Sequence, residues 1–126
     1  MSAARILIPA IALLIGGWLV FDGARALTVG DYLTANTGPH AGQLGPWSLL
    51  LTKAGINPRS TLVKVSHVML GSLWLIGLAF FLFKPALGWW LLLISSLGTL
   101  WYLPLGTVLS LLELALLLTP WIRNLK

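Results

Sequence analysis

The stretch "INPRSTLVKVSHVMLGSLWLIGLAFFLF", Ile56 to Phe83, determines the class of protein to which this chain belongs. Asn57 is a favourable N-cap, and Pro58 is favourable as the first residue of a helix. The helix that they predict, 58–83, has 26 residues and a length of about 39 Å. Because a bilayer's hydrocarbon core is about 30 Å thick, the basic first turns of this helix should lie among lipid headgroups.

The composition supports a membrane protein. The chain has 126 residues, enough for one domain, of which 58% are hydrophobic and 9% charged. A soluble domain carries about 25% charged residues, so this chain has too few to cover its surface against water. It has seven tryptophans, a residue that favours the membrane interface, and no cysteine, which excludes disulfides and thiolate metal sites.

Three further apolar runs complete the predicted fold. We predict an all-α, polytopic integral membrane protein that forms one domain, 1–126, with four transmembrane helices at about 4–22, 58–83, 86–102 and 104–121. The short link between the last two runs predicts an antiparallel hairpin. A rival interpretation of the first run is a cleaved signal peptide, because Arg5 precedes it and "ARA" at 24–26 resembles a cleavage site. We expect a retained membrane helix.

The long polar segment, 23–57, is predicted to be a structured loop that contains a short interfacial helix. In "PWSLLLTKA" Pro46 favours a helix start and Gly55 favours a helix end. Four apolar residues share one face of this helix at helical spacing, and we expect that face to lie flat on the membrane: Trp47, Leu50, Leu51 and Ala54.

The net charge of +5 indicates contact with lipid headgroups rather than with nucleic acid. The basic residues are scattered near the ends of apolar runs, and no basic cluster is interleaved with aromatic residues, so we expect no nucleic-acid partner. With four spans, each side of the membrane receives four basic residues. The N-terminal amine and the basic tail favour both termini inside.

Glu113 is the most informative polar residue, because it lies in the middle of the apolar run "LSLLELALLL". An acidic residue at the centre of a membrane helix costs roughly 2.5–3.5 kcal/mol. Such a residue needs a partner, a protonated state or a function. Two interpretations remain open: a neutral acid bonded to a neighbouring helix, or a group that binds a ligand or a proton.

Other polar side chains should lie in the same leaflet as Glu113. Along the last three predicted helices they gather on the side of the long loop, which predicts a polar crevice open to that side only. Its candidate residues are Glu113, Ser110, Thr107, His67, Ser96 and Thr99. A hydroxyl can instead bond to its own helix. His67 is expected either near the interface, bonded to loop backbone, or paired with Glu113; no ligand spacing supports a metal site, and no cofactor can be identified.

Residues at the predicted helix boundaries and contacts have structural interpretations. Five tryptophans near boundaries are predicted to be interfacial anchors: Trp47, Trp89, Trp90, Trp101 and Trp121. Small residues should let helices approach closely, either within one bundle or between copies: Ala12, Gly16, Gly71, Gly77, Gly88 and Gly98.

No nucleophile elbow, paired carboxylate, P-loop or dinucleotide motif is present, so we expect no enzyme.

The segments "GDYLTANTGPHAGQLGPWSLLLTKAGINPRSTLVK" and "LWYLPLGTVLS" resemble small uncharacterised bacterial inner-membrane proteins of four helices. The resemblance implies a bacterial inner membrane and no particular activity. We expect a non-catalytic membrane subunit or accessory protein that packs against partner subunits or itself in the lipid bilayer, and that binds a lipid, quinone or pigment near Glu113. The alternative is a small transporter or proton-coupled carrier that uses Glu113 and His67.

Overall fold

The computed structural model describes residues 3–34, 43–102 and 105–124, apart from the side chain of Trp121, and all regular structure in these ranges is helical. The prediction of an all-α fold is therefore confirmed for the described part of the chain. The helices are α1 (Ala3–Val29), α2 (Pro46–Lys53), α3 (Thr61–Phe83), α4 (Pro85–Gly98), α5 (Leu105–Leu117) and α6 (Pro120–Arg123).

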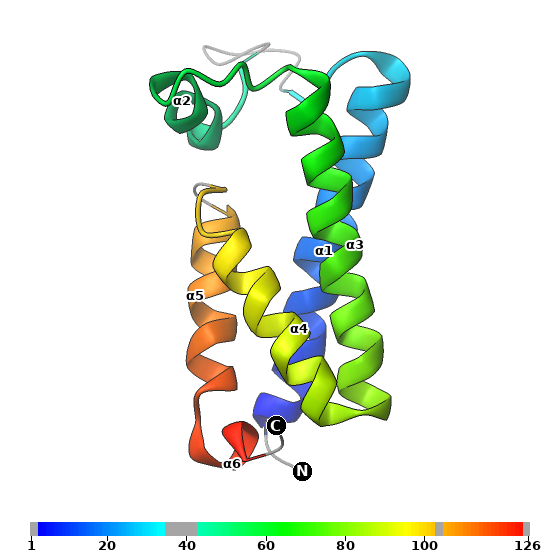
Figure 1. The fold of residues 1–126 in the computed structure, drawn as a ribbon, viewed down its shortest axis with the longest axis vertical. Helices are drawn as coiled ribbons and strands as arrows, with labels where there is room; N and C mark the ends of the chain where they lie inside the picture. Colours follow the sequence, from blue (N-terminus) through cyan, green and yellow to red (C-terminus); the bar gives the residue numbers. More distant parts are fainter. Residues whose placement is uncertain (1–2, 35–42, 103–104, 125–126) are drawn as a thin grey trace.

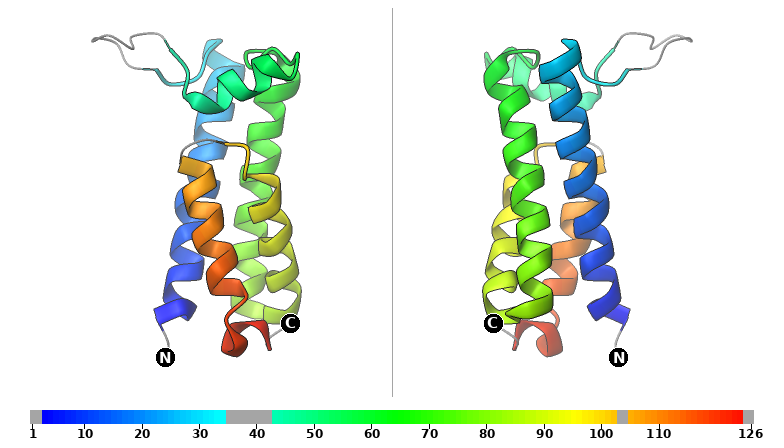
Figure 2. Two further views of the ribbon diagram at one scale, coloured as in Figure 1. Left: turned by 90° about the vertical axis from the view of Figure 1, so that its left-hand side faces the viewer. Right: turned by 90° about the vertical axis from the view of Figure 1, so that its right-hand side faces the viewer.

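Four helices form an up-down-up-down bundle. Helix α1 packs on α3 and α5, and α4 packs on α3 and α5, so each bundle helix has two antiparallel neighbours. The start of α1, the α3–α4 turn and α6 lie at one end (Figure 1). At the other end, which we call the loop end, α2 runs across the bundle above the tips of α4 and α5 (Figure 2).

Two of the helices, α1 and α3, are long and apolar enough to cross a membrane. The prediction of four spans is not confirmed, because α4 has 14 residues and α5 has 13. At 1.5 Å per residue, these helices are about 20 Å long, short of the roughly 30 Å of a hydrocarbon core. Residues that we assigned to their ends leave the helices: Thr99 N bonds to Ser96 O in a tight turn, and Pro120 starts the separate α6.

Two helix boundaries differ from the predicted ones. Helix α1 continues past residue 22 to Val29, and Gly30, at φ 108°, ends it. Helix α3 begins at Thr61 with Ser60 as its N-cap, so the prediction of Asn57 as N-cap was wrong. The Asn57 side chain instead accepts a hydrogen bond from Arg59 N and holds a separate turn before the helix.

The short helix in the long loop is confirmed as α2, from Pro46 to Lys53. Gly55 has φ 83°, which suits a glycine just beyond a helix, and the loop doubles back through a hydrogen bond from Ile56 N to Leu51 O. Of the four predicted apolar face residues, Trp47 is buried and Leu51 half-buried, whereas Leu50 and Ala54 are exposed. The inner face of α2 therefore covers the bundle.

Close backbone contact joins the two long helices. A Cβ added to Gly71 in α3 would lie 2.6 Å from Gly16 O and 2.7 Å from Val20 N in α1. These distances are too short for any side chain, so glycine is required where the helices cross. The predicted role of Gly16 and Gly71 in close helix approach is confirmed. Core residues pack on either side of the crossing: Ile8, Ile15 and Leu19 from α1, and Trp74 and Phe81 from α3.

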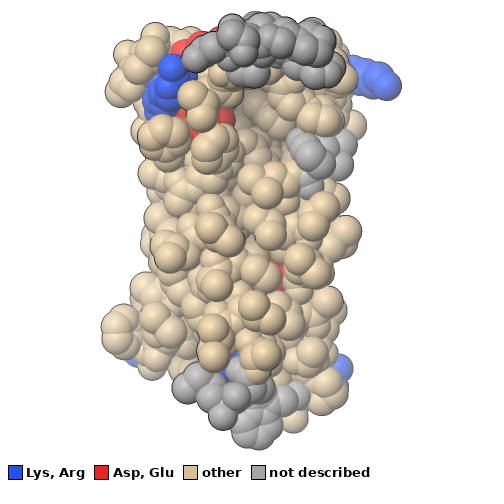
Figure 3. Space-filling model, turned by 180° about the vertical axis from the view of Figure 1, so that it is seen from behind, with Lys and Arg blue, Asp and Glu red and all other residues tan. Residues whose placement is uncertain are grey.

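The outer surface of the bundle is apolar on every helix. Charged groups on the face in Figure 3 lie mainly near its two ends, and tan covers the middle apart from a small red area. Large apolar side chains that are more than half exposed occur on each bundle helix: Leu13 and Leu14, Leu62 and Met69, Ile94 and Leu97, and Val108 and Leu111. So extensive an apolar surface needs lipid or another protein to cover it.

The α1–α3 crossing generates a stability prediction. Gly71→Ala should force α1 and α3 apart and lower the free energy of unfolding by about 1–3 kcal/mol. Gly17→Ala is the matched control, because an added Cβ there meets no atom within 4 Å. Thermal unfolding in a mild detergent measures both variants. Equal stability of the two would show that the helices do not cross as closely as described.

Candidate functional site

Three of the six predicted crevice residues bond to local backbone. Ser96 Oγ donates to Leu92 O at 2.8 Å within α4, and Thr99 Oγ1, at the C-cap of α4, donates to Ser95 O at 2.7 Å. Thr107 Oγ1 donates to Leu100 O at 2.6 Å and ties the start of α5 to the preceding turn. Thr99 also accepts a hydrogen bond from Trp74 Nε1 at 3.0 Å, which links α3 to α4. These hydroxyls are thus occupied in holding the helices.

Ser110 and Glu113 lie one turn apart on the inner face of α5. Both are fully buried. Ser110 Oγ and both carboxylate oxygens of Glu113 have no hydrogen-bond partner among the residues that the structure describes. The interpretation of Glu113 as a neutral acid bonded to a neighbouring helix therefore gains no support from the described contacts, and its polar atoms remain available to a proton or to water.

His67 lies inside the protein, at the loop end of the bundle. Its side chain is fully buried, and its Nδ1 lies 2.9 Å from Val63 O of its own helix, so the expected bond to loop backbone is replaced by one within α3. Its Nε2 is buried with no partner in the described ranges. The pairing with Glu113 is not formed, since neither side chain reaches the other.

Four aromatic rings surround His67, with centroids 4.8–5.7 Å from that of the imidazole. They come from the loop after α1, from α2 and from the turn between α4 and α5. We call these five residues the aromatic cluster: Tyr32, Trp47, His67, Trp101 and Tyr102. Because α4 and α5 stop short of α2, the aromatic cluster fills the space between the hairpin tip and α2.

The tryptophans predicted as interfacial anchors take different positions. Trp47 is buried in the aromatic cluster, and Trp89 is buried and donates to Leu117 O at 2.8 Å, so both contribute to the core and the predicted anchor role was wrong for them. Trp101 is half-buried against Trp47. Trp90, 48% exposed, has the exposure expected of an anchor. The Trp121 side chain lies outside the described residues.

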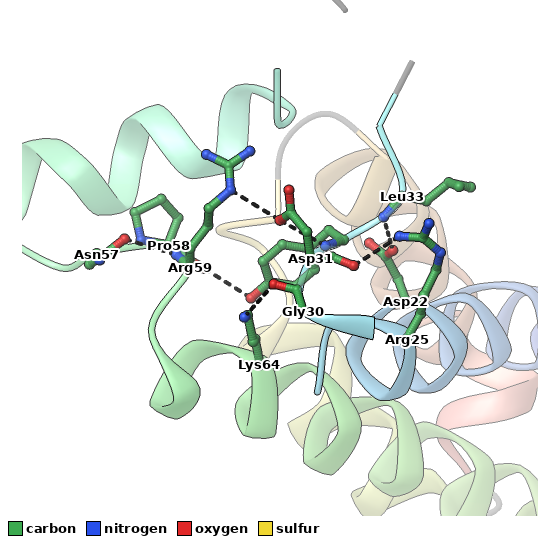
Figure 4. A network of polar contacts seen from close by, with 10 residues as sticks. Asp22, Arg25, Gly30, Asp31, Leu33, Asn57, Pro58, Arg59 and Lys64 are labelled. Carbon is green, nitrogen blue, oxygen red and sulfur yellow. Dashed lines mark hydrogen bonds and ion pairs between the residues drawn. The ribbon is translucent and has the colours of Figure 1, made fainter. Parts of the chain in front are cut away.

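A network of hydrogen bonds joins the loop after α1 to the start of α3 (Figure 4). Asp31 Oδ1 accepts from Arg59 Nε at 3.0 Å and from Tyr32 N at 2.9 Å. Asp31 O accepts from Arg25 Nη1, and Lys64 Nζ donates to Gly30 O. Asp31 therefore connects α1, the loop and the turn before α3 through one side chain and one carbonyl.

Asp31 and Tyr32 are the titratable loop residues of this network. The electrostatics favour an ionised Asp31 and a protonated Tyr32, as their hydrogen bonds require. Partial burial opposes ionisation of Asp31, but the hydrogen bonds from Arg59 and Tyr32 N and the nearby Lys64 charge together lower the pKa of Asp31 below its ordinary value of 3.8. Burial and the charge of Asp22 raise the pKa of Tyr32. Its protonated hydroxyl donates to Pro58 O at 2.9 Å.

Two pockets flank the aromatic cluster. The larger, about 570 Å³, is an apolar groove between the end of α2, the outer face of α3 and Trp101, and we call it the lateral groove. The smaller, about 220 Å³, lies between α1, the loop and the start of α5, and we call it the Asp22 pocket. The lateral groove is lined by Leu51, Ile56, Leu62, Val63, Ser66, Met69, Leu70, Leu73 and Trp101.

The six predicted crevice residues line neither pocket. The sequence placed the crevice on the loop side of Glu113, whereas the pockets lie next to α2, above the hairpin tip. Sequence reasoning missed Asp22, Tyr32 and Tyr102. The available signal was that the long loop retains Tyr32 and Trp47 among its glycines, because aromatic residues in a polar loop need a surface to pack on.

A comparison of the chain with known protein families, with curated proteins and with solved structures finds no match.

The Asp31 network should lose strength in acid. Because the native pKa of Asp31 is lowered, its stabilisation is complete above the unfolded value of 3.8 and is lost as the pH falls through the native pKa. Asp31 and Arg59 side chains are 43% and 45% exposed, so the loss should be at most about 1 kcal/mol. Hydrogen exchange of the Tyr32 amide, which donates to Asp31, measures it after correction for intrinsic rates. Asp31→Asn should remove the pH dependence; if it persists, another group causes it.

Proposed function

We propose that this chain is a small, non-catalytic integral membrane protein whose lateral groove holds the apolar chain of a membrane lipid. The observation that carries the proposal is the groove itself: it is lined almost wholly by apolar side chains and has about 570 Å³ of space. The resemblance noted in the sequence makes a bacterial inner membrane the expected location.

The surroundings of the lateral groove support a lipid occupant. Leu62 and Met69 line the groove and are 73% and 66% exposed, so the groove is continuous with the outer apolar surface of α3. In a bilayer, that surface meets acyl chains directly, and a chain enters the groove sideways without crossing water. Trp101, a member of the aromatic cluster, forms part of its wall.

The remaining outer surface supports a role as a subunit. All four bundle helices expose large apolar side chains, and two of them are shorter than a bilayer is thick. Helices of a partner subunit or of a second copy would cover these faces as well as lipid does. Native mass spectrometry of the full chain extracted in mild detergent distinguishes these arrangements, because it records copies, partners and bound small molecules together.

Blocking the groove tests the lipid proposal. Ser66→Phe places a phenyl ring in the lateral groove and should lower the amount of lipid that copurifies with the protein at least about twofold, because the ring fills the space of the acyl chain. Leu111→Phe, at a 54% exposed position on α5, is the control and should retain lipid as the wild type does. Equal lipid in both variants contradicts the proposal. An ultraviolet or visible band from the bound molecule would instead identify a quinone or a pigment.

A proton-coupled carrier is the second candidate, and the burial of Glu113 without a described partner favours it. A carboxyl group in that position takes up or releases a proton as its surroundings change, and Ser110 Oγ lies one turn away. The carrier was predicted to use both Glu113 and His67. Because His67 has no described hydrogen bond with Glu113, Glu113 alone would hold the proton.

Two substitutions at Glu113 test this candidate. Glu113→Leu removes a buried polar group without a described partner and should raise the free energy of unfolding by about 1–3 kcal/mol. Lower stability would mean that Glu113 is a structural contact. Glu113→Gln keeps the size of the side chain but cannot ionise. In liposomes that contain a pH-sensitive dye, wild-type protein should conduct protons and Glu113→Gln should not; equal proton flux excludes the carrier.

A further inference from the structure

We infer that the Asp22 pocket binds an organic ammonium group, as a methylated amine or a choline-type headgroup. The inference is independent of the lateral groove and of Glu113. It depends on the lining of the pocket, which combines one carboxylate with four aromatic side chains: Trp18, Tyr32, Trp47 and Tyr102.

The carboxylate of Asp22 belongs to the pocket. Asp22 is 3% exposed, on the last third of α1. Among the described residues, the one hydrogen bond to this carboxylate comes from Leu33 N, which donates to Oδ1 at 2.7 Å. The second oxygen, Oδ2, is therefore available to a group inside the pocket. A buried carboxylate with a free oxygen favours a cation or a donor as its partner.

The neighbouring cations do not form an ion pair with Asp22. Arg25 is close to Asp22 along α1, but its Nη1 donates to Asp31 O at 2.9 Å (Figure 4). Arg59 forms its ion pair with Asp31 and not with Asp22, and within the described part of the chain no other ion pair is found. Lys64 Nζ donates to Gly30 O. Asp22 therefore forms no ion pair with a described residue, and the charge of Arg25 acts on it only at longer range.

The aromatic rings give the pocket its preference for an organic cation. The faces of tryptophan and tyrosine rings attract cations, and cages of such rings bind quaternary ammonium groups. The ring centroids of Trp47 lie 5.2 Å from Tyr32 and 5.4 Å from Tyr102, so the three rings form a continuous wall. A metal ion fits less well, because the described residues contain no group of three histidine, cysteine, aspartate or glutamate side chains.

Two of the polar hydrogens around the pocket are already used, which disfavours an anion. Trp18 Nε1 donates to Tyr102 Oη at 2.9 Å, and Tyr32 Oη donates to Pro58 O. The volume also limits the ligand. At about 220 Å³, the pocket is smaller than the roughly 300–1,000 Å³ of sites for drug-sized molecules and suits a single headgroup. The ammonium group could come from a lipid headgroup or from a free solute.

Choline is the probe for this site, and its uncharged analogue, in which carbon replaces nitrogen, is the control. With the full chain in a maltoside detergent at constant ionic strength, we expect choline to change tryptophan fluorescence saturably, with a dissociation constant in the millimolar range. The analogue has the same shape and should bind about tenfold or more weakly. Equal binding of the two, or no binding of choline, overturns the inference.

Asp22→Asn tests the carboxylate. It keeps an oxygen that can accept from Leu33 N and should weaken choline binding about tenfold while leaving binding of the uncharged analogue unchanged. Unchanged choline binding contradicts the inference. If this variant does not fold, the wild-type comparison still decides, and Trp18→Leu against Trp90→Leu tests the rings: the first should weaken choline binding, whereas the second replaces a ring outside the pocket and should not.

Nanodiscs identify the source of the ammonium group. If the headgroup is the ligand, phosphatidylcholine nanodiscs should block free choline, whereas phosphatidylglycerol nanodiscs should not. If the ligand is a free solute, choline should bind equally in both.

Discussion

The structure depends on a mismatch of helix length. Helices α1 and α3 have 27 and 23 residues, whereas α4 and α5 have 14 and 13. The long pair is held together where Gly16 and Gly71 allow backbone contact, and the short pair covers only the part of it away from the loop end. The space that remains above the hairpin tip must be filled, because packed interiors leave no void of that size.

The aromatic cluster fills this space with rings that pack in several orientations. Trp47 meets Tyr32 at an interplanar angle of 80° and Trp101 at 72°, and such edge-to-face contacts each contribute about 0.5–1.5 kcal/mol beyond burial. Gly23 makes room for the central ring, because a Cβ there would lie 2.8 Å from His67 Cβ. The cost is the buried Nε2 of His67, which lacks a described partner. The lateral groove and the Asp22 pocket also result from the difference in helix length. The aromatic rings fill the middle of the space above the hairpin tip and leave a pocket on each side of it.

Local rules predict the ends of α2 but misplace the start of α3, where Ser60 rather than Asn57 is the N-cap, and they fail where tertiary packing decides. Pro46 and Gly55 bound α2 as their backbone preferences require. The lengths of α4 and α5 were overestimated because hydropathy does not distinguish a helix from an apolar turn, as at Trp101. Trp47 was assigned to the membrane interface because nothing local shows that α2 turns it inward.

Polar residues of the predicted crevice illustrate the same limit. Ser96 and Thr99 were predicted to share a polar crevice with Glu113, but their hydroxyls bond to carbonyls one turn back in α4. A sequence shows how far along a helix a hydroxyl lies, but it does not show which group accepts its hydrogen bond. A carbonyl one turn back in the same helix is always within reach. The charged residue that does line a pocket, Asp22, lies near the end of an apolar run and therefore resembled an ordinary helix boundary.

The two pockets are joined mechanically by the cluster between them. Trp47 and Tyr102 line the Asp22 pocket, and Trp101 lines the lateral groove. Trp47 contacts Trp101 directly, with ring centroids 5.9 Å apart, and both rings lie against His67. A ligand that displaced Trp47 on one side would press on Trp101, which walls the groove on the other. Coupling between the pockets would then be reciprocal, since each ligand would alter the affinity for the other by the same factor.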